Sequence, residues 1–224
     1  MGKLEKARLP RGQYIRKKFT RFGLLAFAKR WPKLVDHPRL EIDGDVRTPL
    51  SLDVHEVFCN GREVQQSDFH CVTTWSHLGL FWNGVSFKTF YEAVIVPRAQ
   101  PNERAAHVQF QGADGYRSAM TLTDALADEV MLVDQLNGEP LSLAHGAPLR
   151  LIAPAHYGYK STKHLVKITF SKTERSGVGG PLVHPRARVA LEERGLYLPG
   201  WMYRVIYRAI LPIVFWIYRR NDRG

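Results

Sequence analysis

The 224-residue sequence lacks most of the features that mark common functional classes. Its two cysteines, Cys59 and Cys71, are too few for a disulfide framework and favour a reduced setting. It has no G-x-G-x-x-G, P-loop or H-E-x-x-H motif, so ordinary nucleotide binding and zinc-protease chemistry have no support. The apolar stretch Ala209 to Tyr218 is interrupted by Pro212 and falls well short of the roughly 20 residues that span a bilayer.

A secretion signal is also lacking. The first residues are positively charged, but no apolar run precedes Gly23 and neither a cleavage site nor a twin-arginine motif follows. We therefore expect a cytoplasmic protein.

The positive charge, +11 in total, is concentrated at the two ends of the chain. Residues 1–39 carry a net charge of +10 and residues 201–224 carry +4, which leaves the stretch between them at −3. A nucleic-acid-binding domain usually carries a basic stripe on its folded surface, so we expect no nucleic-acid partner. Basic ends better fit an acidic partner, or peripheral contact with anionic lipid at the inner face of a membrane.

Apolar patterning predicts a mixed, β-rich α+β domain with short helices and long loops. Helices are expected from the caps Ser51 and Ser86, the second ending at Pro97, and over 121–128. We expect an irregular loop over 72–81 and strands over 40–44, 107–110, 131–133, 149–152 and 165–170. The expected organisation is a basic N-terminal arm (1–35) packing on or near a cofactor, a binding domain (36–175) and a basic aromatic tail (176–224).

Both ends of the chain leave two interpretations open. Apolar residues of the arm recur at roughly helical spacing, at Leu24, Leu25, Phe27, Ala28 and Trp31, as in an ordinary surface helix or in an arm that docks on lipid or a partner. The tail either packs on the domain as a C-terminal helix, or it lies at a membrane interface or binds a partner. Its aromatic and basic residues are Trp201, Tyr203, Tyr207, Trp216, Tyr218, Arg204, Arg208, Arg219 and Arg220.

Three groups of residues are candidates for chemistry. Cys71 offers a soft thiolate ligand for a metal, although a lone cysteine between apolar neighbours is more often an inert buried thiol. Arg150 and Lys163 flank a Gly/Pro-broken loop with the hydroxyls of Ser161 and Thr162, a set that suits a phosphate or else a solvated turn. Asp114 lies between two glycines, which favours either close approach of a ligand or a carboxylate that caps its own turn.

The order of these groups resembles the molybdopterin-binding domain of the sulfite oxidase family. The resemblance runs from about Arg8 to about Phe170. It rests on Cys71, Gly112-Ala-Asp-Gly-Tyr116, Asn137-Gly-Glu-Pro-Leu141, His145-Gly-Ala-Pro-Leu-Arg150 and Tyr157-Gly-Tyr-Lys-Ser-Thr-Lys163. It implies a molybdenum-molybdopterin cofactor, with Cys71 as the protein's ligand to the metal.

The resemblance also implies roles for individual residues. His145 and Arg150 would contact the pterin and its phosphate, followed by the consecutive contacts Ser161, Thr162 and Lys163. Asp114 falls on the aspartate of the family's G-x-D turn. Tyr116 falls on its active-site tyrosine, which would donate a hydrogen bond to a metal oxo group or to bound substrate. The N-terminal pterin contacts fall near Thr20 and Arg21.

One departure bears on the substrate. Animal and plant sulfite oxidases have an arginine just after the ligand cysteine, whereas residues 72–77 here contain none. Sulfite is a small dianion that needs fixed cations, so the lack of arginine disfavours sulfite as the substrate. The Cys71-Val-x-x-Trp75-Ser76 pattern more closely resembles the bacterial branch that includes the methionine sulfoxide reductase catalytic subunit. His70, Trp75 and His77 would suit a neutral oxygen donor.

The resemblance therefore implies two-electron oxygen-atom transfer on a small S-oxide, N-oxide or sulfite-like substrate. No second redox centre is encoded, so a separate haem- or quinone-linked electron-transfer partner is expected. The alternative is a non-catalytic subunit that binds molybdopterin, or an adaptor that acts at a membrane or partner.

Overall fold

The computed structural model describes residues 9–23, 27, 29–33, 35–175, 177–179 and 183–221, with the main chain alone at 214 and 217–221. Leu24, Leu25 and Ala28, on which the expected helix of the arm depends, lie outside these residues. The side chains of Tyr218, Arg219 and Arg220 also lie outside them.

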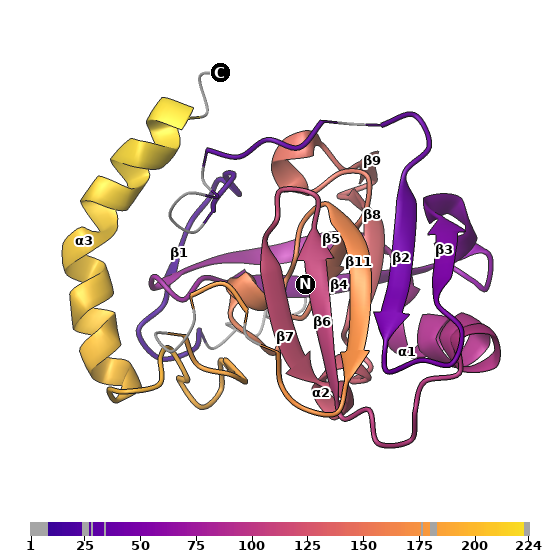
Figure 1. Cartoon of the computed structure of the whole chain (residues 1–224). Coiled ribbons are helices and arrows are strands. Elements are labelled where there is room, and N and C mark those ends of the chain that lie inside the picture. Colours follow the sequence, from indigo (N-terminus) through magenta and orange to yellow (C-terminus); the bar gives the residue numbers. More distant parts are fainter. Residues whose placement is uncertain are drawn as a thin grey trace, which may run out of the picture.

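The described chain forms strands joined by short helices and long loops (Figure 1). The strands are β1 (Tyr14–Ile15), β2 (Arg39–Gly44), β3 (Leu50–Asp53), β4 (Glu63–His70), β5 (Trp75–Ser86), β6 (His107–Gly112), β7 (Arg117–Thr121), β8 (Met131–Leu136), β9 (Glu139–Pro140), β10 (Arg150–Ile152) and β11 (Leu165–Ser171). The helices are α1 (Phe87–Phe90), which continues as a π-helix over Tyr91–Ala99, α2 (Leu122–Ala125) and α3 (Gly200–Asn221). Single 3₁₀ turns cover Val54–Phe58, Leu143–His145 and Gly158–Lys160.

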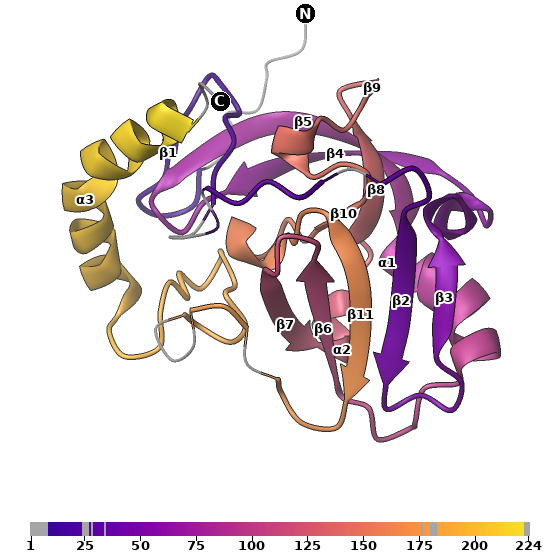
Figure 2. The ribbon, with the colours of Figure 1, turned by 45° about the horizontal axis from the view of Figure 1, so that its top comes forward.

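The strands form two mixed sheets. The first has the order β1-β5-β8-β10, with β4 paired to β5 and β9 to β8, and the second has the order β3-β2-β11-β6-β7. The pairs β1–β5 and β2–β11 are parallel, whereas the other pairs are antiparallel. In Figure 2 the long strands β4 and β5 cross steeply over the strands of the second sheet. The α+β class expected from the sequence is confirmed.

Most of the expected strands form because one of their faces is buried. In β2, Leu40 and Ile42 are fully buried and alternate with Glu41 and Asp43, which face outward. Ser86 caps α1, since its side chain accepts a hydrogen bond from the Thr89 N–H.

Three local expectations were wrong. Ser51 lies inside β3, and Asp53 instead caps the 3₁₀ turn with a capping box to Glu56. The expected loop over 72–81 is mostly β5, which is paired along both edges and so lacks a simple alternation of exposed residues. Pro97 lies within the π-helix, which ends at Ala99.

Two apolar clusters organise the molecule. The larger one lies between the sheets and includes Leu40, Phe110, Leu132 and Phe170, together with Phe87 and Phe90 of α1. The smaller one includes Phe69, Cys71, Trp75, Trp82 and Leu211, with Phe19, Phe22 and Phe215 packed against it. The smaller cluster therefore joins the first sheet to the N-terminal arm and to α3. Within the described chain, no helix is both long enough and apolar enough to cross a membrane.

Truncation of a side chain in the larger cluster should lower the free energy of unfolding much more than truncation of a surface side chain does. Leu132 is fully buried in β8, where it pairs with Val85 and Leu151, so Leu132→Ala should lower the free energy of unfolding by about 2–5 kcal/mol. The matched control is Val64→Ala on β4, where the side chain is 65% exposed and the change should stay within about 0.5 kcal/mol. Urea denaturation measures both. Equal midpoints for the two variants would contradict this core.

Candidate active site

One cleft gathers five of the residues that the sequence singles out: Cys71, Asp114, Tyr116, Ser161 and Lys163. About 620 Å³ of space free of protein atoms lies in the cleft and in the open solvent at its mouth. The described residues that complete its wall are Phe22, Gly23, Phe27, Val72, Thr73, Gly158 and Tyr159. Segments far apart in the sequence, including part of the N-terminal arm, therefore meet around one cavity.

Cys71 follows β4 and is held by a tight turn into β5. Its N–H donates to the Trp75 carbonyl (2.8 Å) and its own carbonyl accepts from the Thr74 N–H (3.1 Å). The thiol is 7% exposed, and its sulfur lies 3.1 Å from the Thr73 hydroxyl oxygen. Burial raises the pKa of the Cys71 thiol, although the charges of Arg194 and Arg16 oppose this shift.

The loop between β6 and β7 supplies Asp114 and Tyr116. One carboxylate oxygen of Asp114 accepts the Tyr116 N–H at 3.0 Å, so this residue both caps its own turn and lines the cleft. The Tyr116 hydroxyl donates to the Tyr159 carbonyl at 2.6 Å. Burial raises the pKa of Tyr116 well above its ordinary value, so the hydroxyl keeps its proton.

Lys163 lies just before β11, where two glycines allow neighbouring loops to approach it closely. A Cβ on Gly112 would lie 2.4 Å from the Lys163 carbonyl. A Cβ on Gly146, whose φ is +112°, would likewise lie 3.2 Å from the Lys163 side chain. The Lys163 ammonium donates to the Phe22 carbonyl at 2.7 Å, so the N-terminal arm lies directly over it.

Arg150, the first residue of β10, is a buried cation without an anionic partner in the described chain. Its Nη1 donates to the His145 carbonyl (2.8 Å) and its guanidinium lies 4.9 Å from the centre of the Trp82 ring. Among the described residues, Nε and Nη2 of Arg150 have no hydrogen-bond partner. Two strong donors are therefore unused in the protein itself.

These cations make the cleft electrostatically unbalanced. Burial, then the charges of Arg150 and Arg21, lower the pKa of Lys163 to about 7, and burial lowers that of Arg150 to about 9. Burial together with Arg150 and Lys163 lowers the pKa of His145 to about 4, so this imidazole is neutral. Asp114 is the carboxylate whose charge acts on Lys163 in the opposite direction.

Several sequence-predicted residues do not line the cleft. Among the described residues of its wall, Thr162, Thr20, Arg21, His145 and Arg150 are missing. His145 and Arg150 are nonetheless close to Lys163, since burial and then the charges of Arg150 and Lys163 lower the pKa of His145. The ring of His145 stacks on that of Phe19, with the ring centres 5.0 Å apart.

Thr162 and Arg21 have other partners. Thr162 is fully buried and its hydroxyl bonds the Ser118 hydroxyl at 2.8 Å, whereas Arg21 donates to the Arg30 carbonyl at 2.7 Å. His70, Trp75 and His77, expected to suit a neutral substrate, are also missing from the described wall. The ring nitrogens of His70 and His77 lie 2.8 Å from the Ser76 hydroxyl and the Arg16 carbonyl.

Arg194 is a residue that sequence reasoning missed. It is fully buried, and its Nη1 donates to the Val72 carbonyl, beside Cys71, at 2.5 Å. Its Nη2 donates to the Arg11 carbonyl (3.0 Å) and its Nε to Glu192 (3.3 Å). These bonds tie the Cys71 turn to both ends of the chain, although no local sequence pattern marks the arginine.

The residues present fit a molybdopterin cofactor. Lys163, the unused Arg150 donors and the Ser161 hydroxyl suit a phosphate, whereas Cys71 on the same cleft suits a soft metal. In the described part of the chain, no group of three or more His, Cys, Asp or Glu side chains could hold a metal ion.

The buried ammonium should leave a signature in the cofactor-free chain. The Lys163 pKa is about 7 in the fold and about 10.4 in an unfolded chain. Between these values the unfolded chain binds more protons, so this residue makes the free energy of unfolding rise with pH, while below about pH 7 its contribution is constant.

The free energy of unfolding of the wild type, less that of Lys163→Met, should therefore increase from about pH 7 to about pH 10. Urea denaturation at several pH values measures it. Lys88→Met, which replaces a surface lysine, should reproduce the wild-type profile. A wild-type minus Lys163→Met difference that does not change across this window would refute the burial of a charged Lys163.

A known protein family matches most of the chain. The family described as "Oxidoreductase molybdopterin binding domain" matches residues 29–178. An uncharacterised oxidoreductase, YuiH, from Bacillus subtilis is 36% identical over 138 residues, which cover 62% of this chain and 67% of the relative.

Two further relatives are named protein-methionine-sulfoxide reductase catalytic subunit MsrP. The one from Campylobacter jejuni is 28% identical over 153 residues (61% of this chain, 50% of the relative). The one from Xanthomonas campestris is 30% identical over 148 residues (58% and 44%). The matches thus span about half the length of these two relatives.

The fold also has a solved counterpart. The sulfane dehydrogenase SoxCD from Paracoccus pantotrophus superposes with a TM-score of 0.56 at 20% identity, covering 70% of this chain and 45% of that one. This likeness concerns the fold alone, whereas the family match covers most of the sequence. The chain belongs to the family of oxidoreductases with a molybdopterin-binding domain.

Proposed function

We propose that this chain is a molybdenum-dependent oxidoreductase that removes an oxygen atom from a small, neutral S-oxide or N-oxide. One observation carries the proposal: Cys71 and Lys163 line the same cleft, and Arg150 is close enough to Lys163 for its charge to lower the lysine's pKa. A metal ligand and a phosphate anchor in one cavity match the two ends of a single metal-pterin cofactor.

The residues have separate tasks in this proposal. Lys163, Arg150 and Ser161 would hold the phosphate, and Cys71 would ligate the metal. The molybdenum, when bound, would supply the two-electron chemistry. Arg194 would fix the main chain beside Cys71, and so the direction from which its sulfur reaches the metal.

A neutral substrate is favoured by the wall of the cleft. Phe22, Phe27, Val72, Tyr116 and Tyr159 make this wall largely apolar and aromatic. Arg194 brings positive charge close to Cys71, but its three nitrogens already donate to Val72, Arg11 and Glu192. Because these donors already have partners, Arg194 is not available to bind a sulfite dianion.

Reduction of an S-oxide consumes two electrons and two protons and yields a thioether and water. Two sulfoxide reductase catalytic subunits among the relatives support this direction. The electrons would come from a separate haem- or quinone-linked protein. Tyr116 would donate its hydrogen bond to the substrate only after releasing the Tyr159 carbonyl.

Cysteine variants test the assignment directly. In protein purified with about one molybdenum per chain, Cys71→Ser should abolish reduction of S-oxides by a reduced dye and leave the thermal unfolding curve intact. Cys59→Ser is the matched control, because this exposed cysteine lies outside the cleft, and it should keep full turnover.

A substrate panel with sulfite, methyl sulfoxides and N-oxides then tests the substrate class. Faster turnover of sulfite than of every neutral oxide would contradict the proposed substrate. Full activity in Cys71→Ser would contradict the assignment of Cys71 as the metal ligand. A wild-type chain without molybdenum, after expression in a host that makes the cofactor, would instead support an adaptor.

Arg150 gives a test of the cofactor anchor that needs no turnover. Because Arg150 is buried with two unused donors, Arg150→Met should leave the melting temperature of the cofactor-free chain equal or higher. The same variant should lose most of its molybdenum during purification, since the phosphate loses a charged donor.

Metal analysis and thermal unfolding measure the two effects. The control is Arg62→Met, which removes a surface ion pair with Asp134 and should retain the metal. An Arg150→Met variant that melts earlier and keeps its molybdenum would show a purely structural arginine.

A further inference from the structure

Helix α3 lies at one edge of the molecule, on the side of β1 (Figure 1). Its inward side packs on the body through Leu211, which is 7% exposed, and through Phe215, whose ring lies 3.9 Å from the Arg16 guanidinium. Arg208 donates to the Gly12 carbonyl at 3.4 Å, and Arg204 approaches Glu192 at 3.7 Å. The helix is thus fixed against the N-terminal segment by one side only.

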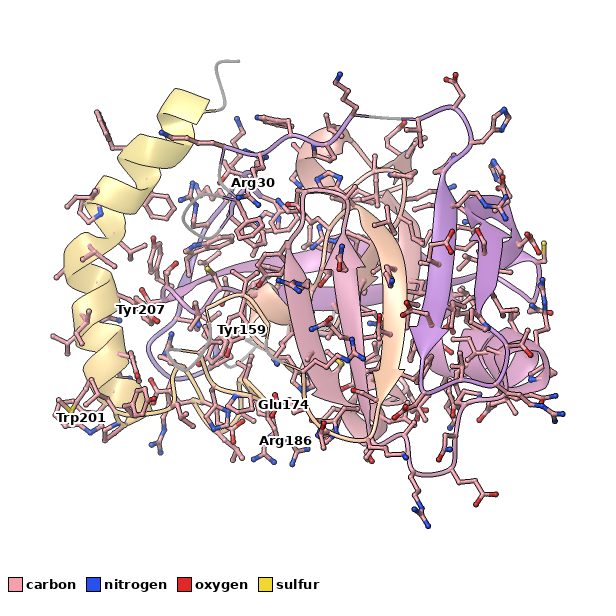
Figure 3. All side chains as sticks on the ribbon, viewed as in Figure 1. Arg30, Tyr159, Glu174, Arg186, Trp201 and Tyr207 are labelled. Carbon is pink, nitrogen blue, oxygen red and sulfur yellow. The ribbon has the colours of Figure 1, made fainter. Side chains whose placement is uncertain are left out.

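The other side of α3, here called the outer face, is a long apolar surface. Trp201 (56%), Val205 (61%), Ile213 (61%) and Trp216 (57%) are all more than half exposed, with Ile206 and Ile210 between them. The two tryptophans lie fifteen residues apart, so the stripe is roughly 22 Å long at 1.5 Å per residue. Figure 3 shows Trp201 at the lower end of the helix and Tyr207 higher along it.

The charge of α3 has a single sign. The helix carries no acidic residue between Gly200 and Asn221. Arg204 and Arg208 contact the body on the inward side, and Arg219 and Arg220 follow the stripe in the sequence. Exposed Lys17 and Lys18 belong to the segment just after β1, which runs beside α3. Cations beside a stripe that ends in tryptophans are typical of a helix lying in the plane of an anionic membrane surface.

We propose that the outer face of α3 binds the headgroup region of a membrane that contains anionic lipid. The stripe is convex and belongs to one helix, so a fluid surface can cover all of it without a complementary groove. Tryptophan side chains prefer the boundary between acyl chains and headgroups, and the exposed Lys17 and Lys18 beside the helix can reach lipid phosphates. The inference does not depend on the proposed oxygen-atom transfer, because it uses no residue of the cleft.

Vesicle flotation of the full chain tests the proposal. With vesicles of about 30% phosphatidylserine in phosphatidylcholine, the wild type should float, and Val205→Glu/Ile213→Glu should bind at least about tenfold more weakly, because two apolar contacts are lost. Both positions are exposed, so the melting temperature should stay unchanged. Val64→Glu, at 65% exposure on β4, is the matched control and should float like the wild type.

Two further readouts sharpen the result. Binding should weaken on pure phosphatidylcholine and with added salt, because salt screens the attraction between anionic lipid and the basic residues near the stripe. Vesicles should shift the tryptophan emission of the wild type to the blue, and Trp201→Phe/Trp216→Phe should lose most of that shift.

Equal flotation of the wild type and Val205→Glu/Ile213→Glu would overturn the proposal. A wild-type dimer in size-exclusion chromatography that this variant converts to a monomer, together with no vesicle binding, would assign the face to a second copy of the chain instead.

Discussion

The structure depends on a buried concentration of positive charge that the protein does not neutralise by itself. Lys163 and Arg150 donate to main-chain carbonyls, those of Phe22 and His145, and not to carboxylates. Placing such groups away from water opposes folding, so the surrounding apolar packing has to offset the cost. A bound dianion would pair with these cations, so their burial would then favour the folded, ligand-bound state. The same feature that costs the cofactor-free chain stability therefore gives it affinity for a phosphate-bearing ligand.

Much of the site follows from the sequence because its motifs have local physical causes. Gly146 and Gly112 stand where a side chain would collide with Lys163, so their pattern marks the loops that meet there. Asp114 shows that two interpretations of one residue can both hold, since it caps its turn and lines the cleft. Thr162 lies inside the expected motif, yet its hydroxyl bonds Ser118 across 44 residues of sequence. A motif thus locates a loop better than it orients each side chain.

Some elements of the fold could likewise be predicted from the sequence, whereas others could not. Strands β2, β6 and β11 were predictable because at least one face of each is buried between the sheets. Strand β5 was not, since its pairing with β4 and β8 and its position between two apolar clusters remove the period-two pattern. Arg194 was also beyond reach, because its bonds to Val72 and Arg11 cross 122 and 183 residues. Contacts of that separation leave no trace in local composition.

The surroundings of Cys71 extend past the segment by which the family is identified. That segment covers residues 29–178, yet Phe22 lies over Lys163 and Arg194 holds the carbonyl next to Cys71. Burial, and then the charges of Tyr203 and of a Cys71 thiolate, raise the pKa of Tyr207 of α3, so this helix also faces the surroundings of Cys71. Because both ends of the chain close around the thiol, they help to shape the site. A surface that engages the outer face of α3 would therefore lie about one helix diameter, roughly 10 Å, from the residues that surround the proposed metal ligand.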